Sequence, residues 1–99
     1  MHARMSIFEG SPEQMDESLR QAREVVLPRG RQLDGFKGMI HLEDRQSGKT
    51  IGITFWESEE AMRASEEEAN QLREESAEAS GEAIADVERY EVSLFEVEG

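Results

Sequence analysis

The residues best suited to chemistry are His41, Thr54 and Trp56, in the middle of the chain. Histidine titrates near neutral pH and often serves as a general base. Tryptophan offers a large face for stacking and a polar N–H group. Brought together, these side chains would suit a pocket for a flat aromatic ligand, with His41 as the candidate catalytic residue. The competing interpretation is that Trp56 only fills the core and that His41 has a structural role.

Other kinds of chemistry find little support in the sequence. There is no cysteine, which excludes disulfides, thiolate nucleophiles and zinc bound by cysteine. The two histidines form no metal motif, and neither a glycine-rich phosphate loop nor a nucleophile elbow is present. We therefore expect no metal and no cofactor. Arg4 and Tyr90 are suited to binding a phenolate or a carboxylate, although a surface ion pair and strand-end packing are the simpler explanations.

The candidate residues fall on two predicted strands, which span residues 36–45 and 50–57. Between them, Ser47 and Gly48 are typical of a two-residue hairpin turn. The second strand ends in a tryptophan and is followed by Ser58, which suits a helix cap. The sequence therefore predicts an antiparallel hairpin that leads into a helix.

The register of this hairpin decides which side chains share a face. A two-residue turn pairs His41 with Thr54 and Met39 with Trp56. Because side chains alternate along a strand, His41, Thr54 and Trp56 then share a face with Gly52, which leaves room for a ligand beside the indole. We expect any small-molecule site on this face, toward the helices. A β-bulge in either strand would exchange the two faces.

The opposite face of the hairpin is almost wholly apolar. Soluble monomers rarely expose so large an apolar patch. We therefore expect a homodimer in which two copies pack these faces together about a two-fold axis. The predicted interface residues are Phe36, Ile40, Leu42, Ile51, Ile53 and Phe55.

The N-terminal third predicts a strand followed by a helix. Residues 2–8 have the length of a short strand. Ser11 then suits an N-cap, with Pro12 at the first helical position and Gln14 placed to complete a capping box. Pro28 lacks the N–H group that a helix needs, so the helix should kink or restart there.

The C-terminal part predicts a second helix, from Ser58 to Gly81, and a last strand over residues 86–98. The resulting order, βαββαβ, indicates an α+β, ferredoxin-like fold: a four-stranded antiparallel sheet with two helices on one face. The second helix should turn one side to water. That side is expected to carry Glu66, Glu67, Asn70, Arg73 and Glu74.

Length and charge limit the remaining possibilities. The 99 residues make one domain, residues 1–99. A formal charge of −12 repels nucleic acid and anionic membranes. No apolar run approaches the roughly 20 residues that span a bilayer, and the N-terminus lacks the apolar core of a signal peptide. We expect a cytoplasmic protein without nucleic-acid or membrane partners.

Two segments point to a known family. The run GFKGMIHLEDRQSGKTIGITFWESEEAMRASEEEANQLREE, with the closing VERYEV, resembles the antibiotic biosynthesis monooxygenase family of the dimeric α/β-barrel superfamily. The resemblance covers essentially the whole chain and is closest to small bacterial members with this Trp-Glu-Ser-x-Glu-Ala junction. It implies a dimeric α/β barrel. Some members of this family oxidise polyketide quinols with molecular oxygen and without a cofactor, and others degrade haem.

The family's catalytic residues carry over only in part. Quinol-oxidising members have an asparagine four residues before the tryptophan and a tyrosine six residues after it; here Gly52 and Met62 stand there, so only Trp56 carries over. Haem-degrading members bind iron through a histidine on the following helix, and no histidine follows His41. Where they use an asparagine on the first strand, Ser6 or Arg4 is present.

Two functions follow as hypotheses. The first is cofactor-independent oxidation of a small aromatic, quinol-like compound, as the resemblance implies. The second is a non-catalytic dimeric module that binds a small molecule or has a regulatory role, because it kept the barrel and lost the asparagine and the tyrosine.

Overall fold

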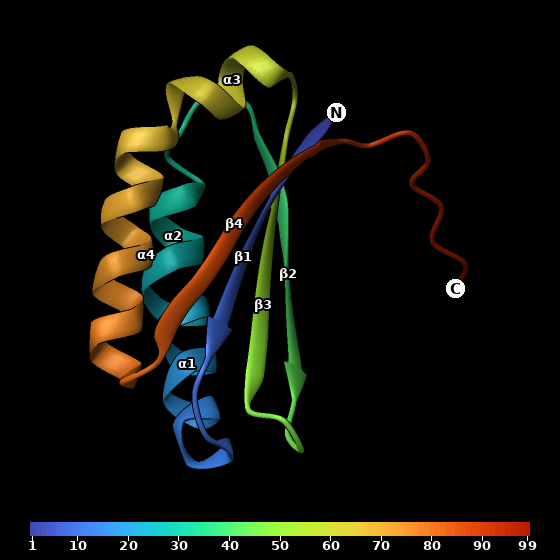
Figure 1. Cartoon of the computed structure of the whole chain (residues 1–99). Helices are drawn as coiled ribbons and strands as arrows, with labels where there is room; N and C mark the ends of the chain where they lie inside the picture. Colours follow the sequence, from blue (N-terminus) through green and yellow to red (C-terminus); the bar gives the residue numbers. More distant parts are fainter.

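The four strands form one antiparallel sheet in the order β2-β3-β1-β4 (Figure 1). The computed structural model describes residues 1–99. All helices lie on one face of the sheet (Figure 1). The predicted ferredoxin-like α+β fold is confirmed. The strands are β1 (His2–Glu9), β2 (Phe36–Asp44), β3 (Lys49–Trp56) and β4 (Ala83–Glu91).

The helical segments begin and end where their caps predict. Gln14 accepts a hydrogen bond from the Ser11 N–H group at 2.7 Å, as a capping box requires. The Ser58 hydroxyl accepts one from the Ala61 N–H group at 3.1 Å, and Gly81 ends the last helix with a φ of 81°. The segments are η1 (Pro12–Gln14), α1 (Met15–Gln21), η2 (Ala22–Val26), α2 (Leu27–Gly30), α3 (Glu59–Ala64) and α4 (Glu66–Ser80).

The first helix passes through Pro28 without breaking. Its predicted kink or restart takes the form of a π-helical turn, η2, in which the Leu27 N–H group donates to the Ala22 carbonyl five residues earlier. Proline lacks an N–H group and its ring crowds the carbonyl four residues before it. The wider turn relieves that crowding and keeps the segment helical.

The hairpin has a longer turn than the sequence predicts. Asp44 pairs with Lys49, so the connection spans four residues, and the predicted two-residue turn at Ser47-Gly48 is wrong. The Asp44 carboxylate accepts hydrogen bonds from the Gln46 N–H group and the Ser47 hydroxyl, at 3.0 and 2.9 Å, which stabilises the longer turn. The register moves by two residues, and an even shift leaves the faces of most side chains unchanged.

A β-bulge at the start of β2 corrects one predicted interface residue. Phe36 pairs with Trp56, whereas Gly38 pairs with Phe55, so Lys37 is an extra residue. Phe36 therefore lies on the helix-facing side, where its ring meets that of Trp56 edge to face at 5.5 Å. The prediction that Phe36 belongs to the outer apolar face is wrong.

The last strand is shorter at its C-terminal end than predicted. β4 ends at Glu91, and the Val92 N–H group makes a last bond to the Met1 carbonyl at 2.9 Å. Residues 92–99 form no strand and extend past the end of the sheet as a C-terminal arm (Figure 1). The ring of Phe95 on this arm meets that of Phe55 on β3 edge to face at 5.4 Å.

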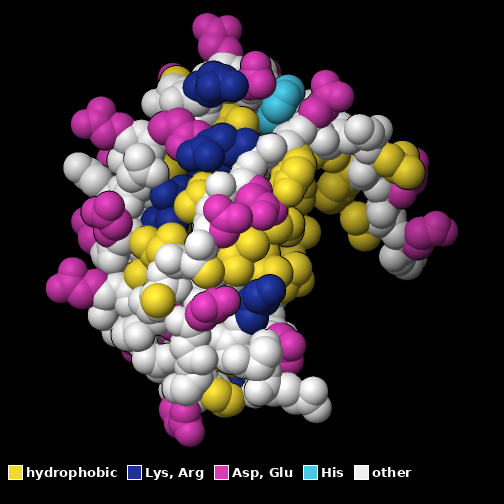
Figure 2. Space-filling view, viewed as in Figure 1, with side chains coloured by type: hydrophobic (Ala, Val, Ile, Leu, Met, Phe, Trp, Pro, Cys, Tyr) yellow, Lys and Arg dark blue, Asp and Glu magenta, His cyan; other side chains and the backbone are white.

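The core lies between the sheet and the helices. Met15, Trp56, Met62 and Leu72 are buried there. On the other face of the sheet, hydrophobic side chains border the hollow beneath the C-terminal arm (Figure 2). None of the helices combines the length and the apolar composition that a membrane span requires.

Candidate functional site

A cavity of about 80 Å³ lies between the helices and the inner face of the sheet. Its volume suffices for several water molecules, and it is smaller than the roughly 300–1,000 Å³ of typical ligand pockets. A single aromatic ring is therefore the largest unit that we expect it to admit without movement of the helices. Its apolar wall includes Phe8, Val26, Leu33, Phe36, Met39, Trp56 and Leu72, and its polar wall includes Arg4, Ser6, His41, Thr54 and Arg73.

The structure brings the four predicted pocket residues to this cavity. Trp56, Thr54, His41 and Gly52 all line it, although His41 pairs with Gly52 rather than with Thr54. A Cβ atom at Gly52 would meet no other atom within 4 Å, so this glycine does leave open space. That a ligand occupies the space remains a prediction.

Trp56 fills the core and borders the cavity at the same time. It is 2% exposed, and its N–H group donates to the Thr54 hydroxyl at 2.9 Å. The guanidinium carbon of Arg4 lies 5.4 Å from the centre of the indole, within cation–π range. Because the N–H group already has a partner, the indole offers a ligand its ring surface rather than a hydrogen bond.

His41 has a carboxylate neighbour that sequence reasoning did not assign to it. Its Nε2 atom lies 3.4 Å from Oε1 of Glu43, and both side chains are mostly buried. Nε2 has no other partner, and Glu43 also contacts Arg45 at 3.0 Å. The signal was available, because residues two apart on a strand point to the same face.

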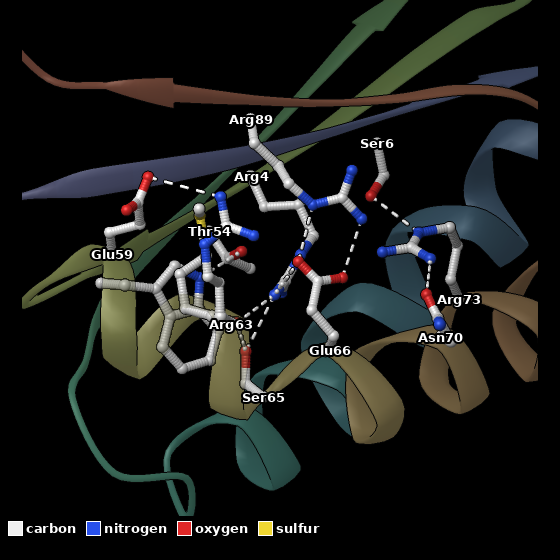
Figure 3. Close-up of polar contacts among 12 residues, drawn as sticks. Arg4, Ser6, Thr54, Glu59, Arg63, Ser65, Glu66, Asn70, Arg73 and Arg89 are labelled. Atoms are coloured by element: carbon white, nitrogen blue, oxygen red, sulfur yellow. Dashed lines mark hydrogen bonds and ion pairs between the residues drawn. The ribbon is translucent and has the colours of Figure 1, made fainter.

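Arg4 reaches from β1 into the interior and is 2% exposed. Its Nη2 group donates to the Met62 carbonyl at 2.7 Å and to the Ser65 hydroxyl at 2.9 Å, and lies 3.2 Å from Glu66 (Figure 3). Burial lowers the pKa of Arg4, and Glu66 opposes that change. The two simpler explanations for Arg4, a surface ion pair and ordinary packing at the end of a strand, therefore do not apply.

Glu66 is shared by two arginines. Arg89 donates to both of its oxygens, at 2.6 and 2.8 Å, and Arg4 contacts it as well. The hydrogen bonds from Arg89 are the main reason that the pKa of Glu66 falls to about 2. The carboxylate therefore stays ionised, and its negative charge is divided between two cations.

Arg73 on α4 also lines the cavity, and it is 8% exposed. It donates to the Ser6 hydroxyl at 3.0 Å and to the Asn70 side-chain oxygen at 2.7 Å (Figure 3). Burial is the main cause that lowers its pKa, and the nearby positive charge of Arg4 adds to it. No carboxylate forms an ion pair with it.

The predicted water-facing side of the second helix is wrong for Arg73. The buried positions of α4 are Leu72, Arg73, Ala77 and Ser80, which form one helical face. Arg73 lies on this face next to Leu72, and its side chain reaches Ser6 on β1. Composition alone assigns a lone arginine on a glutamate-rich helix to solvent, so the burial of Arg73 has no clear mark in the sequence.

Tyr90, the other candidate for binding an anion, does not line the cavity. It is half exposed on β4, and its hydroxyl donates to Glu88 at 2.6 Å. The structure also brings together no group of three histidine, aspartate or glutamate side chains that could hold a metal ion.

No protein-family model matches the sequence. Among curated relatives, the uncharacterized proteins Rv2557 and Rv2558 of Mycobacterium tuberculosis (strain ATCC 25618 / H37Rv) are 37% and 36% identical over 95 residues. The match covers 96% of this chain, and 42% and 40% of the two relatives. The chain therefore spans less than half the length of the curated relatives that it matches.

Solved structures with the same fold are more informative. A Deinococcus radiodurans protein assigned to the antibiotic biosynthesis monooxygenases matches with a TM-score of 0.71 at 19% identity, covering 100% of both chains. The fold is that of the antibiotic biosynthesis monooxygenases. The ActVA-Orf6 monooxygenase of Streptomyces coelicolor, solved with the ligand Nanaomycin D, has a TM-score of 0.72 at 15% identity over 98% of this chain and 92% of its own.

Two further structures share this monooxygenase fold. SnoaB, a cofactor-independent oxygenase from Streptomyces nogalater, matches with a TM-score of 0.64 at 16% identity, covering 95% of this chain and 94% of its own. A dimeric ferredoxin-like protein from an uncultured marine organism has a TM-score of 0.64 at 12% identity, covering 98% of this chain and 92% of its own. At these identities the likeness shows the fold alone.

Proposed function

We propose that this protein binds a small aromatic molecule in the cavity beside Trp56 and oxidises it with molecular oxygen without a cofactor. The observation that supports this best is the cavity itself, which joins an indole face, the open space at Gly52 and His41, whose imidazole has Glu43 as a neighbour outside the cavity. Monooxygenases and a cofactor-independent oxygenase share the fold. The small volume favours a compound with one ring, such as a substituted hydroquinone.

The chemistry would begin with loss of a proton from a phenolic hydroxyl. His41 is the candidate base, and Glu43 would stabilise the imidazolium that forms. The resulting phenolate gives up electrons more readily than the neutral phenol. Loss of two electrons and of the second proton yields the quinone, while O2 takes up both electrons and both protons to become hydrogen peroxide.

Oxygen consumption with methylhydroquinone tests this proposal, with the rate in protein-free buffer subtracted. We expect the protein to accelerate oxygen uptake and quinone formation. His41→Gln should lose about 10²-fold or more of that acceleration, because the base is gone. His41→Gln should still bind the quinol, because Trp56 and the apolar wall of the cavity remain. Rates equal to those of buffer would contradict catalysis.

The alternative is a non-catalytic module that binds the same class of ligand. Gly52 and Met62 favour it, because quinol-oxidising family members resemble this chain but carry asparagine and tyrosine at these two positions. Met62 is buried and does not line the cavity. Saturable binding of methylhydroquinone without accelerated oxidation would support this alternative over the first.

In either case we infer that the working form is a homodimer. Ile40 and Leu42, on the outer sheet face, are 39% and 46% exposed. The C-terminal arm adds Leu94 and Val97, which are more than three-quarters exposed. A second copy packed on this face would cover them. The dimeric ferredoxin-like protein that shares the fold supports this assembly.

A further inference from the structure

The cavity wall differs in charge from the rest of the chain. The protein has 23 acidic and 11 basic residues, yet no aspartate or glutamate lines the cavity, whereas Arg4 and Arg73 do. Both arginines are more than nine-tenths buried. Burying a cation without a counter-charge is unfavourable, and Arg73 forms no ion pair, so this wall has a place for a negative charge.

The nearby carboxylate does not balance these cations. Glu66 is shared between Arg4 and Arg89, so three arginines, with Arg73, have one carboxylate among them (Figure 3). Arg73 has only neutral partners, the Ser6 hydroxyl and the Asn70 amide. The Nε atom of Arg4 is buried and has no hydrogen-bond partner. The cluster therefore keeps both positive charge and donor capacity.

The apolar part of the wall suits an aromatic ring. Trp56 and Phe36 border the cavity as an edge-to-face pair, and Leu72 adds aliphatic surface. Rings pack well against such surfaces, and guanidinium groups match the planar shape of a carboxylate. One small cavity thus combines an aromatic and a cationic part.

We propose that the cavity selects a single-ring aromatic carboxylate, with the ring against Trp56 and the carboxylate directed toward Arg73 and the Nε atom of Arg4. This inference rests on the proposed function, because it uses the same cavity, and it names the class of compound that the cavity prefers. A benzoate with two hydroxyl groups placed as in a hydroquinone carries both the two phenolic protons that the proposed oxidation removes and the carboxylate that the arginines would hold.

Isothermal titration calorimetry with salicylate and salicylamide tests this preference. The two compounds have nearly the same shape, but only salicylate is an anion at pH 7. We expect the wild type to bind salicylate about tenfold or more tightly than salicylamide. Arg73→Gln removes the charge and should weaken salicylate binding about tenfold or more, while salicylamide binding stays the same.

Arg29→Gln is the matched control. Arg29 joins α2 to α4 through Glu68 and Glu75, both at 2.7 Å, and does not line the cavity. It should leave both affinities unchanged. Circular dichroism checks that each variant folds. If Arg73→Gln does not fold, the comparison of salicylate with salicylamide on the wild type decides whether the cavity prefers a carboxylate.

The outcomes separate this inference from the proposed function. Equal binding of salicylate and salicylamide, or binding of methylhydroquinone alone, overturns the preference for a carboxylate and leaves the aromatic site standing. Failure of the wild type to bind salicylate, salicylamide and methylhydroquinone overturns the aromatic site itself, and with it the carboxylate preference.

Discussion

The two faces of the sheet place their side chains in opposite settings. The helix-facing side buries Arg4 and Arg73 at a cavity that aromatic rings also line. The outer side leaves Ile40 and Leu42 substantially exposed. Both arrangements are unfavourable for an isolated chain, since charges prefer water and apolar groups avoid it. We interpret each as the mark of a missing partner: a small anion inside, and a second copy of the chain outside.

Ile53→Glu should have the largest effect, and it tests the outer face. Ile53 lies on β3 opposite Ile40, on the side that we infer to be covered in the dimer. A carboxylate there would be buried without a partner, which costs several kcal/mol. We expect the variant to dissociate into monomers and to lose much of its stability, as measured by light scattering and thermal unfolding.

Gln46→Glu is the control for this change, because it adds the same charge in the exposed hairpin turn. It should leave the dimer intact. A wild-type protein that scatters light as a stable monomer at micromolar concentration, with the circular dichroism of a folded α+β protein, would contradict the dimer.

Trp56→Ala should have the next largest effect, and it tests the inner face. The side chain is almost fully buried against Phe36 and Arg4, so its removal should cost about 3–5 kcal/mol of unfolding free energy. Arg63→Ala, on the exposed side of α3, should cost less than about 0.5 kcal/mol. Urea unfolding followed by circular dichroism, at one protein concentration, compares the two. Equal losses would show that Trp56 is not a packing centre.

Glu66→Gln should have a smaller effect that depends on pH. The folded-state pKa of Glu66 is about 2, below the ordinary value of 4.5. Its ionised form therefore stabilises the fold above about pH 4.5, and this contribution is lost as the pH falls from 4.5 toward 2. Partial exposure to solvent reduces the contribution to about 1–2 kcal/mol.

The stability difference between wild type and Glu66→Gln should accordingly shrink between pH 4.5 and 2, when both are unfolded with urea. Glu67→Gln, its exposed neighbour on α4, should show no such trend. A difference that stays constant down to pH 2 would contradict the assigned ion pairs with Arg89 and Arg4.

The sequence predicts the fold well because its signals are local and agree with one another. Capping residues fix the starts of both helices, and alternation along β2 and β3 separates the two faces. The hairpin turn was wrong by two residues, because the Asp44 side chain organises a longer turn that the Ser47-Gly48 signal does not reveal. The predicted assignment of most side chains to the two sheet faces still holds, because an even shift in register preserves their alternation.

The candidate site was only partly predictable. Trp56, Thr54, His41 and Gly52 come from one hairpin, so alternation could bring them to one face. Phe36 was misplaced because a bulge leaves no clear mark in the sequence. Arg73 was missed because its burial depends on how α4 is turned against the sheet, which is a tertiary effect. The ion pairs of Glu66 are also a tertiary effect, because its two arginine partners come from β1 and β4.

The emission of Trp56 offers the most direct test of a binding site on the inner face. It is the only tryptophan, so a change in emission during anaerobic titration with methylhydroquinone reports on this cavity. Gly52→Val is the matched variant, because a Cβ atom there would meet no other atom within 4 Å. Valine favours strands, so the variant should fold with wild-type stability or better.

We expect the wild type to show saturable quenching, and Gly52→Val to lose at least about tenfold in affinity because the added methyl groups occupy the space for the ring. Unfolding in urea checks that the variant is intact. Quenching that does not saturate in the wild type, or that is equally strong in a folded Gly52→Val protein, would show that the cavity beside Trp56 is not where an aromatic ligand binds.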